Sequence, residues 1–234
     1  MAHVLYLQHA PEWTESRLAD ILRAQGHTVE FRCPPAGDPL PATADEVDAL
    51  IIGGNTVSTH EAHERPDVAA EIHLAASALE TGTPYIGICF GAQALAEAVG
   101  CGNAGRADGI SEFGFYPITP TEAGRGILDG LDHVFQSHYA ACLATPPGAV
   151  LLASSQHFEV QAFRIGERAY GLQFHPDARD DMIPGWYEGN TYLHGRPGVH
   201  ALDRQVEDAA RYERSIHEWC ERFLAHWLPM ATTR

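Results

Sequence analysis

Cys89 has the setting most typical of a reactive side chain in this sequence. The apolar residues 84–88 predict a buried strand, which runs into Gly87-Ile88-Cys89-Phe90-Gly91. Residues 92–99, which end at Gly100, predict a helix directly afterwards. A nucleophile on a sharp strand-to-helix turn needs flanking glycines, and the amides at the helix N-terminus favour a thiolate. We therefore interpret Cys89 as a nucleophile; the alternative is a structural cysteine buried after a core strand.

His175 is the candidate general base. The chain holds 14 histidines, so a histidine alone is weak support, but His175 follows a predicted strand and precedes Asp177 by two positions. Side chains two apart in an extended segment point the same way, so Asp177 should reach the far nitrogen of His175 and fix its tautomer. The alternative is a strand-end histidine beside a solvated aspartate.

Two backbone amides are candidates for stabilising an oxyanion. One belongs to Phe90, directly after the nucleophile, and the other to Gly54, in the Gly53-Gly54 pair that ends a predicted strand. The glycine pair is weak support by itself, because most such pairs are turns.

Other histidines are weaker candidates. His138 is a second candidate base, but it has an aromatic neighbour and lacks a nearby carboxylate. His60 and His63 lie three apart beside glutamates without forming a His-Glu-x-x-His motif. We therefore expect a solvated helix start there and no metal site.

Strands and helices alternate in the N-terminal part of the chain. Residues 4–8, 28–31, 47–52 and 84–88 predict apolar strands, residues 68–80 predict a helix, and Thr14 is expected to cap a helix that runs to Gln25. This order indicates a flavodoxin-like, mainly parallel sheet with helices on both faces. Sites in such sheets lie beyond the carboxyl ends of the strands, so Gly53-Gly54 and Cys89 should meet.

The pattern changes after Gly100. Residues 113–119, 150–154, 160–165 and 169–174 predict antiparallel strands appended to the parallel sheet, whereas residues 177–198 have no clear period. From Ala201 a long amphipathic helix is predicted, whose apolar stripe should dock on the chain's own sheet rather than on a partner. We expect one domain over residues 1–234, with a core over about residues 3–180 and a helical extension over about residues 181–234.

The composition excludes several classes of function. Hydrophobic residues make up 45% of the 234 residues and charged residues 20%, as in an ordinary globular protein. The net charge of −16 repels phosphate backbones and anionic lipids, so we expect no nucleic-acid partner and no membrane partner. The five cysteines are widely spaced, and the N-terminus lacks a basic region followed by a long apolar run. Reduced thiols in a cytoplasmic protein are therefore expected.

Four segments resemble a known family, the class I glutamine amidotransferases, in particular the glutaminase domain of GMP synthase and its free-standing relatives. The resemblance covers about residues 47–177. Its segments are Ile52-Gly53-Gly54-Asn55, Gly87-Ile88-Cys89-Phe90-Gly91-Ala92-Gln93, Ser137-His138-Tyr139 and Gly171-Leu172-Gln173-Phe174-His175-Pro176-Asp177. The second and the fourth are specific, and their presence in this order argues against a chance match.

The resemblance implies a catalytic triad of Cys89, His175 and Asp177 that hydrolyses the glutamine side-chain amide through a γ-glutamyl thioester. It also implies an oxyanion hole formed by Gly54 and Phe90. The substrate-binding residues that it implies are Gly53, Gln93, Ser137, His138 and Tyr139. The family usually has Glu at the position of Asp177 and Pro at that of Asn55, which bears on the His175 contact and on the shape of the oxyanion loop.

These features favour a cysteine-dependent glutaminase that releases ammonia and needs no cofactor. In the family, ammonia normally passes to a synthase, for which 234 residues leave no room, so a separate synthase subunit is one expected partner. The alternative is a free-standing γ-glutamyl peptide or γ-glutamyl amine hydrolase, which predicts a wider pocket beyond Cys89. A catalytically idle regulatory module is a third hypothesis, and a homodimer is left open.

Overall fold

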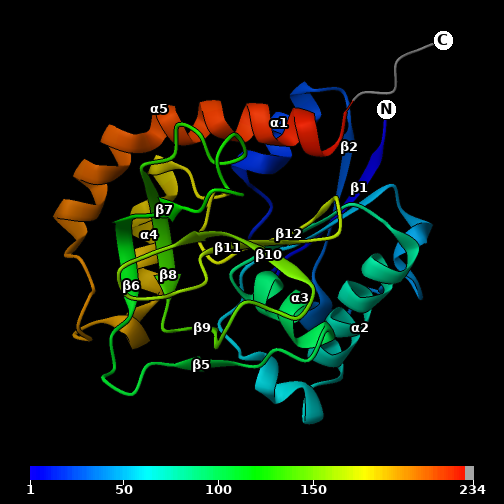
Figure 1. Cartoon of the computed structure of the whole chain (residues 1–234), viewed down its shortest axis with the longest axis horizontal. Helices are drawn as coiled ribbons and strands as arrows, with labels where there is room; N and C mark the ends of the chain where they lie inside the picture. Colours follow the sequence, from blue (N-terminus) through cyan, green and yellow to red (C-terminus); the bar gives the residue numbers. More distant parts are fainter. Residues whose placement is uncertain (230–234) are drawn as a thin grey trace.

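The computed structural model describes residues 1–229, and this part of the chain contains five α-helices (Figure 1). The helices are α1 (Arg17–Ala24), α2 (Pro66–Thr81), α3 (Phe90–Ala98), α4 (Ile183–Gly189) and α5 (Leu202–Trp227). The strands are β1 (His3–Leu7), β2 (Thr28–Arg32), β3 (Ala49–Ile52), β4 (Tyr85–Ile88), β5 (Asn103–Gly105), β6 (Glu112–Pro117), β7 (Thr119–Pro120), β8 (His133–His138), β9 (Ala140–Cys142), β10 (Ala149–Ser154), β11 (Ala162–Ile165) and β12 (Ala169–Leu172).

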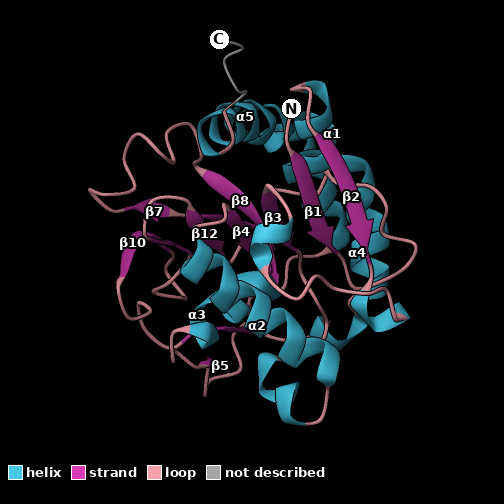
Figure 2. Cartoon of the chain, turned by 90° about the vertical axis from the view of Figure 1, so that its right-hand side faces the viewer, coloured by secondary structure: helices cyan, strands magenta, loops and turns pink. Residues whose placement is uncertain are grey.

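Eight of these strands form one sheet, in the order β2-β1-β3-β4-β12-β11-β10-β7. The first five are parallel, as the adjacent pair β1 and β2 shows in Figure 2, and the last three run antiparallel to their neighbours. The predicted mainly parallel sheet with appended antiparallel strands is confirmed. The prediction for β12 is wrong in part, because β12 is antiparallel to β11 but parallel to β4, with Leu172 opposite Ile88. This pairing places the segment after β12 beside the segment after β4.

The four inner parallel strands, β1, β3, β4 and β12, contribute to two apolar cores, one on each face of the sheet. In β1, Val4 and Tyr6 belong to one core, Leu5 and Leu7 belong to the other, and all four are buried. Burial on both faces is the reason that these strands are continuously apolar. α1 and α5 cover the first face, and α2 and α3 cover the second (Figure 1). The predicted helices on both faces are therefore confirmed.

The apolar stripe of α5 packs on the chain's own sheet, as predicted. Phe223 meets the ring of Tyr170 in β12 edge-on, with ring centroids 5.0 Å apart, and stacks on Trp219 at 4.7 Å. The buried apolar side chains of this stripe are Ala209, Ile216, Trp219, Cys220, Phe223, Leu224 and Trp227. The helical spacing of apolar residues also predicts Val206 on this stripe, but its side chain is exposed. Residues 230–234, the end of the predicted extension, lie outside the described residues.

Two predictions about single elements are wrong. α1 begins at Arg17, with Ser16 at the N-cap position, so Thr14 does not cap it. β6 pairs with β8 in a separate two-stranded sheet and not with the main sheet. The polar end of β8, which includes Gln136 and His138, gives that strand no simple apolar alternation from which it could be predicted.

The region without a clear period, residues 177–198, contains α4. This helix has Pro184 in its first turn, where the missing N–H group costs nothing, but its two glycines weaken any helical pattern. α4 and the loop of residues 9–16 both lie over the carboxyl edge of the parallel strands, where they line the cavity described below.

Candidate active site

Cys89 lies in a strained turn between β4 and α3. Its φ is +51° and its ψ is −101°, and within residues 1–229 no other non-glycine residue has a positive φ. Such a conformation costs about 1–3 kcal/mol and persists only where the surroundings enforce it. A Cβ atom on Gly87 would lie 2.3 Å from the Gly91 carbonyl, and one on Gly91 would lie 2.0 Å from the Ile52 carbonyl oxygen. Both flanking glycines are thus required by close backbone approach, as the elbow prediction assumed.

His175 and Asp177 lie together beside Cys89. Nδ1 of His175 is 3.2 Å from Oδ1 of Asp177, so the shorter side chain of Asp still reaches the ring directly. The Tyr6 hydroxyl donates to the other carboxylate oxygen at 3.4 Å. Because Nδ1 is engaged, Nε2 is the nitrogen left for Cys89, and Cys89, His175 and Asp177 line one cavity.

The electrostatics of this cluster favour a protonated His175. Burial lowers the pKa of the ring, but the charge and hydrogen bond of Asp177 and those of Cys89 outweigh burial and raise the pKa to about 10. A protonated imidazole beside a cysteine stabilises the thiolate. The cluster therefore places a protonated imidazole beside the Cys89 side chain at neutral pH.

We expect the stabilising contribution of the His175–Asp177 pair to fall as the pH rises. The folded-state pKa of His175 is raised from 6.5 to about 10, so this contribution is complete below about pH 6.5 and is lost as the pH approaches 10. Urea unfolding of the wild type and of Asp177→Asn should show the largest difference in free energy of unfolding just below pH 6.5. A difference that stays constant or grows towards pH 10 would contradict the raised pKa.

The amides of Gly54 and Phe90 lie at the same site. A Cβ atom on Gly54 would lie 2.6 Å from Cε1 of His175, which places this backbone against the imidazole ring. The Gly91 N–H donates to the Gly53 carbonyl at 3.3 Å, and since the peptide is trans, the Gly54 N–H points the opposite way. Within residues 1–229, neither the Gly54 amide nor the Phe90 amide donates to a backbone acceptor. Both are therefore free to bind a developing negative charge.

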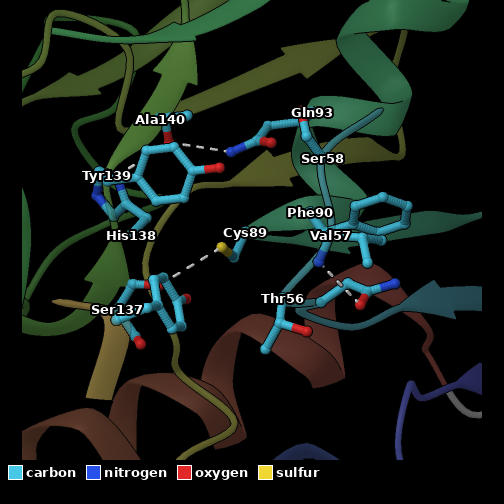
Figure 3. Close-up of a pocket in the computed structure, with 12 residues that line it drawn as sticks. Thr56, Val57, Ser58, Cys89, Phe90, Gln93, Ser137, His138, Tyr139 and Ala140 are labelled. Carbon is cyan, nitrogen blue, oxygen red and sulfur yellow. Dashed lines mark hydrogen bonds between the residues drawn. The ribbon is translucent and has the colours of Figure 1, made fainter. Parts of the chain in front are cut away.

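Most of the predicted substrate-binding residues line a narrow pocket on one side of Cys89 (Figure 3). Ser137, His138 and Tyr139 come from the end of β8 and the residue after it, and Gln93 comes from α3, where its Nε2 donates to the Ala140 carbonyl at 3.0 Å. The free space is about 20 Å³, close to that of a single water molecule. Gly53, also predicted to bind substrate, lines the larger cavity instead.

The prediction that His138 lacks a nearby carboxylate is wrong. Nε2 of His138 lies 3.3 Å from Oε2 of Glu112, and both side chains are buried. Burial of Glu112 acts to raise its pKa, but His138, Ser155 and Gln161 together lower the pKa below its ordinary value. Nδ1 of His138 contacts the Ala140 carbonyl oxygen at 3.1 Å and must carry a hydrogen. Nε2, the nitrogen that could act as a base, faces Glu112 without forming a hydrogen bond to any described residue. The contact was missed because Glu112 is paired with His138 only through the β6–β8 register.

A cavity of about 610 Å³ adjoins the narrow pocket at Cys89 and Ser137. The loop of residues 9–16 and helix α4 form its walls, where Trp13 stacks on Trp186 with ring centroids 6.4 Å apart. The Trp186 ring also meets the His175 ring edge-on at 4.8 Å. Glu12 and Glu15 lie at the cavity, and no arginine or lysine is among its described lining residues. The wider pocket beyond Cys89 is thus present.

Residues 15–182 match the family model described as glutamine amidotransferase class-I. The chain belongs to this family. It is accordingly an enzyme of the amidotransferase type, and the resemblance of its four segments is confirmed.

Two curated relatives illustrate the similarity. The glutamine amidotransferase-like protein YfeJ of Salmonella typhimurium is 32% identical over 187 residues, which cover 74% of this chain and 72% of YfeJ. A glutamine-hydrolysing GMP synthase of Streptomyces avermitilis is 33% identical over 181 residues, which cover 68% of this chain. The match spans only 30% of that synthase.

Solved structures of glutamine amidotransferases share the fold. The protein from Thermotoga maritima has a TM-score of 0.84 at 24% identity, covering 97% of this chain and 98% of its own. The protein from Methylobacillus flagellatus has a TM-score of 0.85 at 23% identity, covering 96% and 93%.

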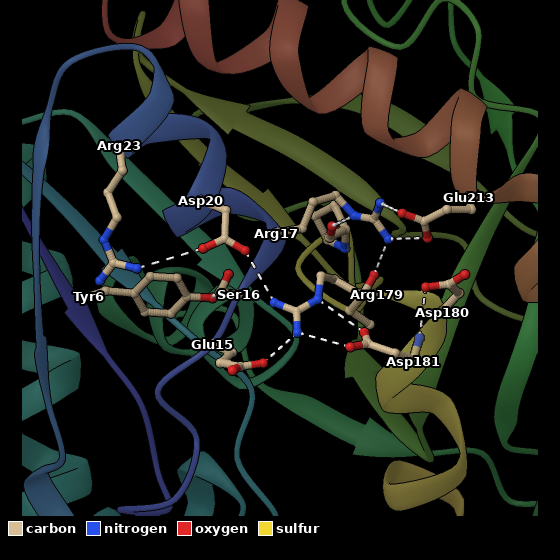
Figure 4. A network of polar contacts seen from close by, with 12 residues as sticks. Tyr6, Glu15, Ser16, Arg17, Asp20, Arg23, Arg179, Asp180, Asp181 and Glu213 are labelled. Atoms are coloured by element: carbon tan, nitrogen blue, oxygen red, sulfur yellow. Dashed lines mark hydrogen bonds and ion pairs between the residues drawn. The ribbon is translucent and has the colours of Figure 1, made fainter.

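In this amidotransferase, Arg17 holds the segment that carries Asp177. Figure 4 shows its guanidinium facing Glu213. The buried guanidinium donates to the backbone carbonyls of Pro176, at 3.0 Å, and of Ala178. It also forms a bidentate pair with Glu213 of α5. Bidentate arginine pairs fix orientation as well as contributing energy. α5 thus anchors the segment on which the His175–Asp177 contact depends.

Several residues at the site were not predicted. Tyr6 and Arg17 lie far from Asp177 in sequence, and only the topology rule that sites gather at the carboxyl ends of strands would have pointed to the end of β1. Within residues 1–229, no three His, Cys, Asp or Glu side chains are placed together to hold a metal ion. No helix in this part of the chain is long and apolar enough to cross a membrane.

Proposed function

We propose that the chain hydrolyses the side-chain amide of glutamine through a γ-glutamyl thioester on Cys89 and releases ammonia. The observation that supports this most strongly is the convergence of Cys89, His175 and Asp177 on one cavity. The two free amides, of Gly54 and Phe90, lie beside them. Nucleophile, base, orienting carboxylate and oxyanion donors are the groups that acyl transfer requires.

In the first half-reaction, the Cys89 thiolate attacks the carbonyl carbon of the amide. The oxyanion that forms accepts hydrogen bonds from the N–H groups of Gly54 and Phe90. As the C–N bond breaks, His175 donates the proton on Nε2 to the departing nitrogen, and ammonia leaves. Asp177 keeps the ring oriented and stabilises its charged form.

In the second half-reaction, water hydrolyses the thioester. His175, now neutral at Nε2, takes a proton from the water as it attacks the thioester carbonyl, and the same two amides bind the second oxyanion. The C–S bond breaks, glutamate leaves, and the thiolate–imidazolium pair is restored.

The test is ammonia release by the purified chain, measured with glutamine and with a series of γ-glutamyl amides and peptides. Turnover of glutamine supports a glutaminase. Turnover of the larger amides without turnover of glutamine would select the alternative function. No turnover of either would favour a catalytically idle module.

The cavity of about 610 Å³ favours the second candidate, hydrolysis of γ-glutamyl peptides or γ-glutamyl amines. Ammonia needs none of this space, whereas a substituted amine or an amino acid would occupy it as the leaving group. The cavity touches Cys89 and His175, so a substituent on the scissile nitrogen would pass directly into it. Its described lining is aromatic and contains no arginine or lysine, which suits an amine better than an acid.

A variant that fills the cavity tests this assignment. A Cβ atom on Gly185, in α4, would meet no atom within 4 Å, so Gly185→Phe should place its ring in the cavity without straining the backbone. If leaving groups bind there, the ratio of kcat/KM for γ-glutamyl benzylamide to that for glutamine should fall about tenfold or more, given the usual worth of lost apolar contacts. An unchanged ratio would show that the leaving group does not bind in the cavity.

A separate synthase subunit that receives ammonia is the partner that a glutaminase function implies. The relation to GMP synthases, of which the chain matches 30% in the Streptomyces protein, supports this expectation. Such a subunit would have to cover the mouth of the large cavity.

A further inference from the structure

His9 and Glu71 form a buried pair that the mechanism above does not use. Nε2 of His9 lies 2.9 Å from Oε2 of Glu71, and their side chains are only 1% and 0% exposed. His9 follows β1 and Glu71 lies in α2, so the pair joins two elements that are distant in sequence. Burying a carboxylate is costly without a partner. Among the described residues, the other carboxylate oxygen of Glu71 has no hydrogen-bond partner. The contact with His9 is therefore the one that compensates for burying this carboxylate.

The other nitrogen of His9 contacts the oxyanion loop. Nδ1 lies 2.6 Å from the Gly54 carbonyl oxygen. A carbonyl oxygen only accepts hydrogen bonds, so Nδ1 must carry a hydrogen. Glu71, by engaging Nε2, fixes the ring in the orientation that directs this N–H group at Gly54. The His9 ring also meets the Phe90 ring edge-on, with centroids 5.1 Å apart.

Two successive peptides of the loop are therefore held in place. The Gly91 N–H binds the Gly53 carbonyl and so orients the peptide that carries the Gly54 amide. His9 binds the Gly54 carbonyl and so orients the next peptide. Residue 55 is an asparagine, so no proline ring restrains the backbone at that position.

We propose that His9, oriented by Glu71, is a positioning residue that holds the loop of residues 53–55 so that the Gly54 amide faces the oxyanion. This inference rests on the proposed function, because it concerns the same acyl transfer. His9 would act on kcat, since the oxyanion forms only after substrate has bound.

Two substitutions separate the two hydrogen bonds of His9. The amide of Asn can take the place of Nδ1, so His9→Asn keeps a donor for Gly54 and loses the contact with Glu71. The longer side chain of Gln takes the place of Nε2, so His9→Gln keeps the contact with Glu71 and loses the donor for Gly54. His27→Gln serves as the control, because His27 is also buried and bonded to a backbone group, the amide of Ala2, near the opposite ends of the strands.

We expect His9→Gln to lower kcat about 10²-fold, as for the misplacement or loss of one oxyanion donor, with KM changed less than about threefold. The kcat of His9→Asn should be at least tenfold higher than that of His9→Gln. His9→Asn should be the less stable variant, because Glu71 is then buried without its contact to Nε2. The rate of Cys89 alkylation by iodoacetamide should stay near the wild-type value in both, because alkylation forms no oxyanion. His27→Gln should behave as the wild type.

Equal kcat values for His9→Gln and the wild type would overturn the proposal, as would a loss that follows thermal stability rather than the donor. In either case wild-type turnover that depends on Cys89 would leave the proposed function intact. A wild type that turns over neither glutamine nor any γ-glutamyl amide would overturn the proposed function and this inference with it.

Discussion

Cys89→Ala should lower kcat for glutamine, or for the best γ-glutamyl amide, at least about 10⁴-fold. Losing the nucleophile removes the covalent route altogether, and what remains is the catalysis that binding and the oxyanion donors supply. The substitution shortens the side chain by one sulfur atom at a strained turn, so the fold should survive it. The measurement is ammonia or amine release at saturating substrate, beside circular dichroism of both proteins.

Cys101→Ala is the matched control. Cys101 is also buried and lies just beyond the other end of α3, where its thiol contacts the Ala144 carbonyl at 3.3 Å. The kcat of Cys101→Ala should stay within about threefold of the wild-type value, as expected for a residue that acts only through packing. Comparable rates for the wild type and Cys89→Ala would reject Cys89 as the nucleophile.

His175→Asn should lower kcat about 10³-fold or more, because it removes the group that moves the proton in both half-reactions. Asn can still donate to Asp177 in place of Nδ1, so the change removes mainly the Nε2 atom that faces the thiol. Loss of the imidazolium should also slow alkylation of Cys89 at neutral pH, since less of the thiol is then ionised. In the His9 variants, by contrast, we expect alkylation of Cys89 at the wild-type rate.

His133→Asn controls for the loss of a histidine on the same face of the fold. His133 lies at the start of β8 and stacks on Tyr212, with ring centroids 4.4 Å apart, remote from the cavity. Both the turnover and the alkylation rate should match the wild type. Normal alkylation in His175→Asn together with lost turnover would mean that His175 does not ionise Cys89.

The parts of the site that depend on neighbouring residues could be predicted from the sequence. The elbow at Cys89 follows from two glycines whose Cβ atoms would clash with backbone, and such a requirement is visible in residue types alone. The contact between His175 and Asp177 follows from the period of an extended segment. The parallel sheet follows from continuous apolar strands that alternate with helices.

The parts of the site that depend on strand register and on packing across the sheet could not be predicted from the sequence. Glu112 meets His138 only because β6 and β8 pair with those two residues opposite each other. Arg17 reaches Glu213, and His9 reaches Glu71, across elements far apart along the chain. The parallel pairing of β12 with β4 depends on which strands are neighbours, which apolar periodicity does not encode. Long-range contacts of this kind leave no local pattern.

The most direct test of the central claim is covalent labelling by a glutamine analogue in which a diazoketone replaces the side-chain amide. Such a compound enters the glutamyl site and alkylates the nucleophile there. Peptide mapping should find a single label on Cys89, blocked by excess substrate and much slower to form in His175→Asn. A label on Cys33, Cys101, Cys142 or Cys220 would contradict the assignment of Cys89 as the nucleophile. A label on Cys89 that excess substrate does not prevent would contradict its place in the substrate site.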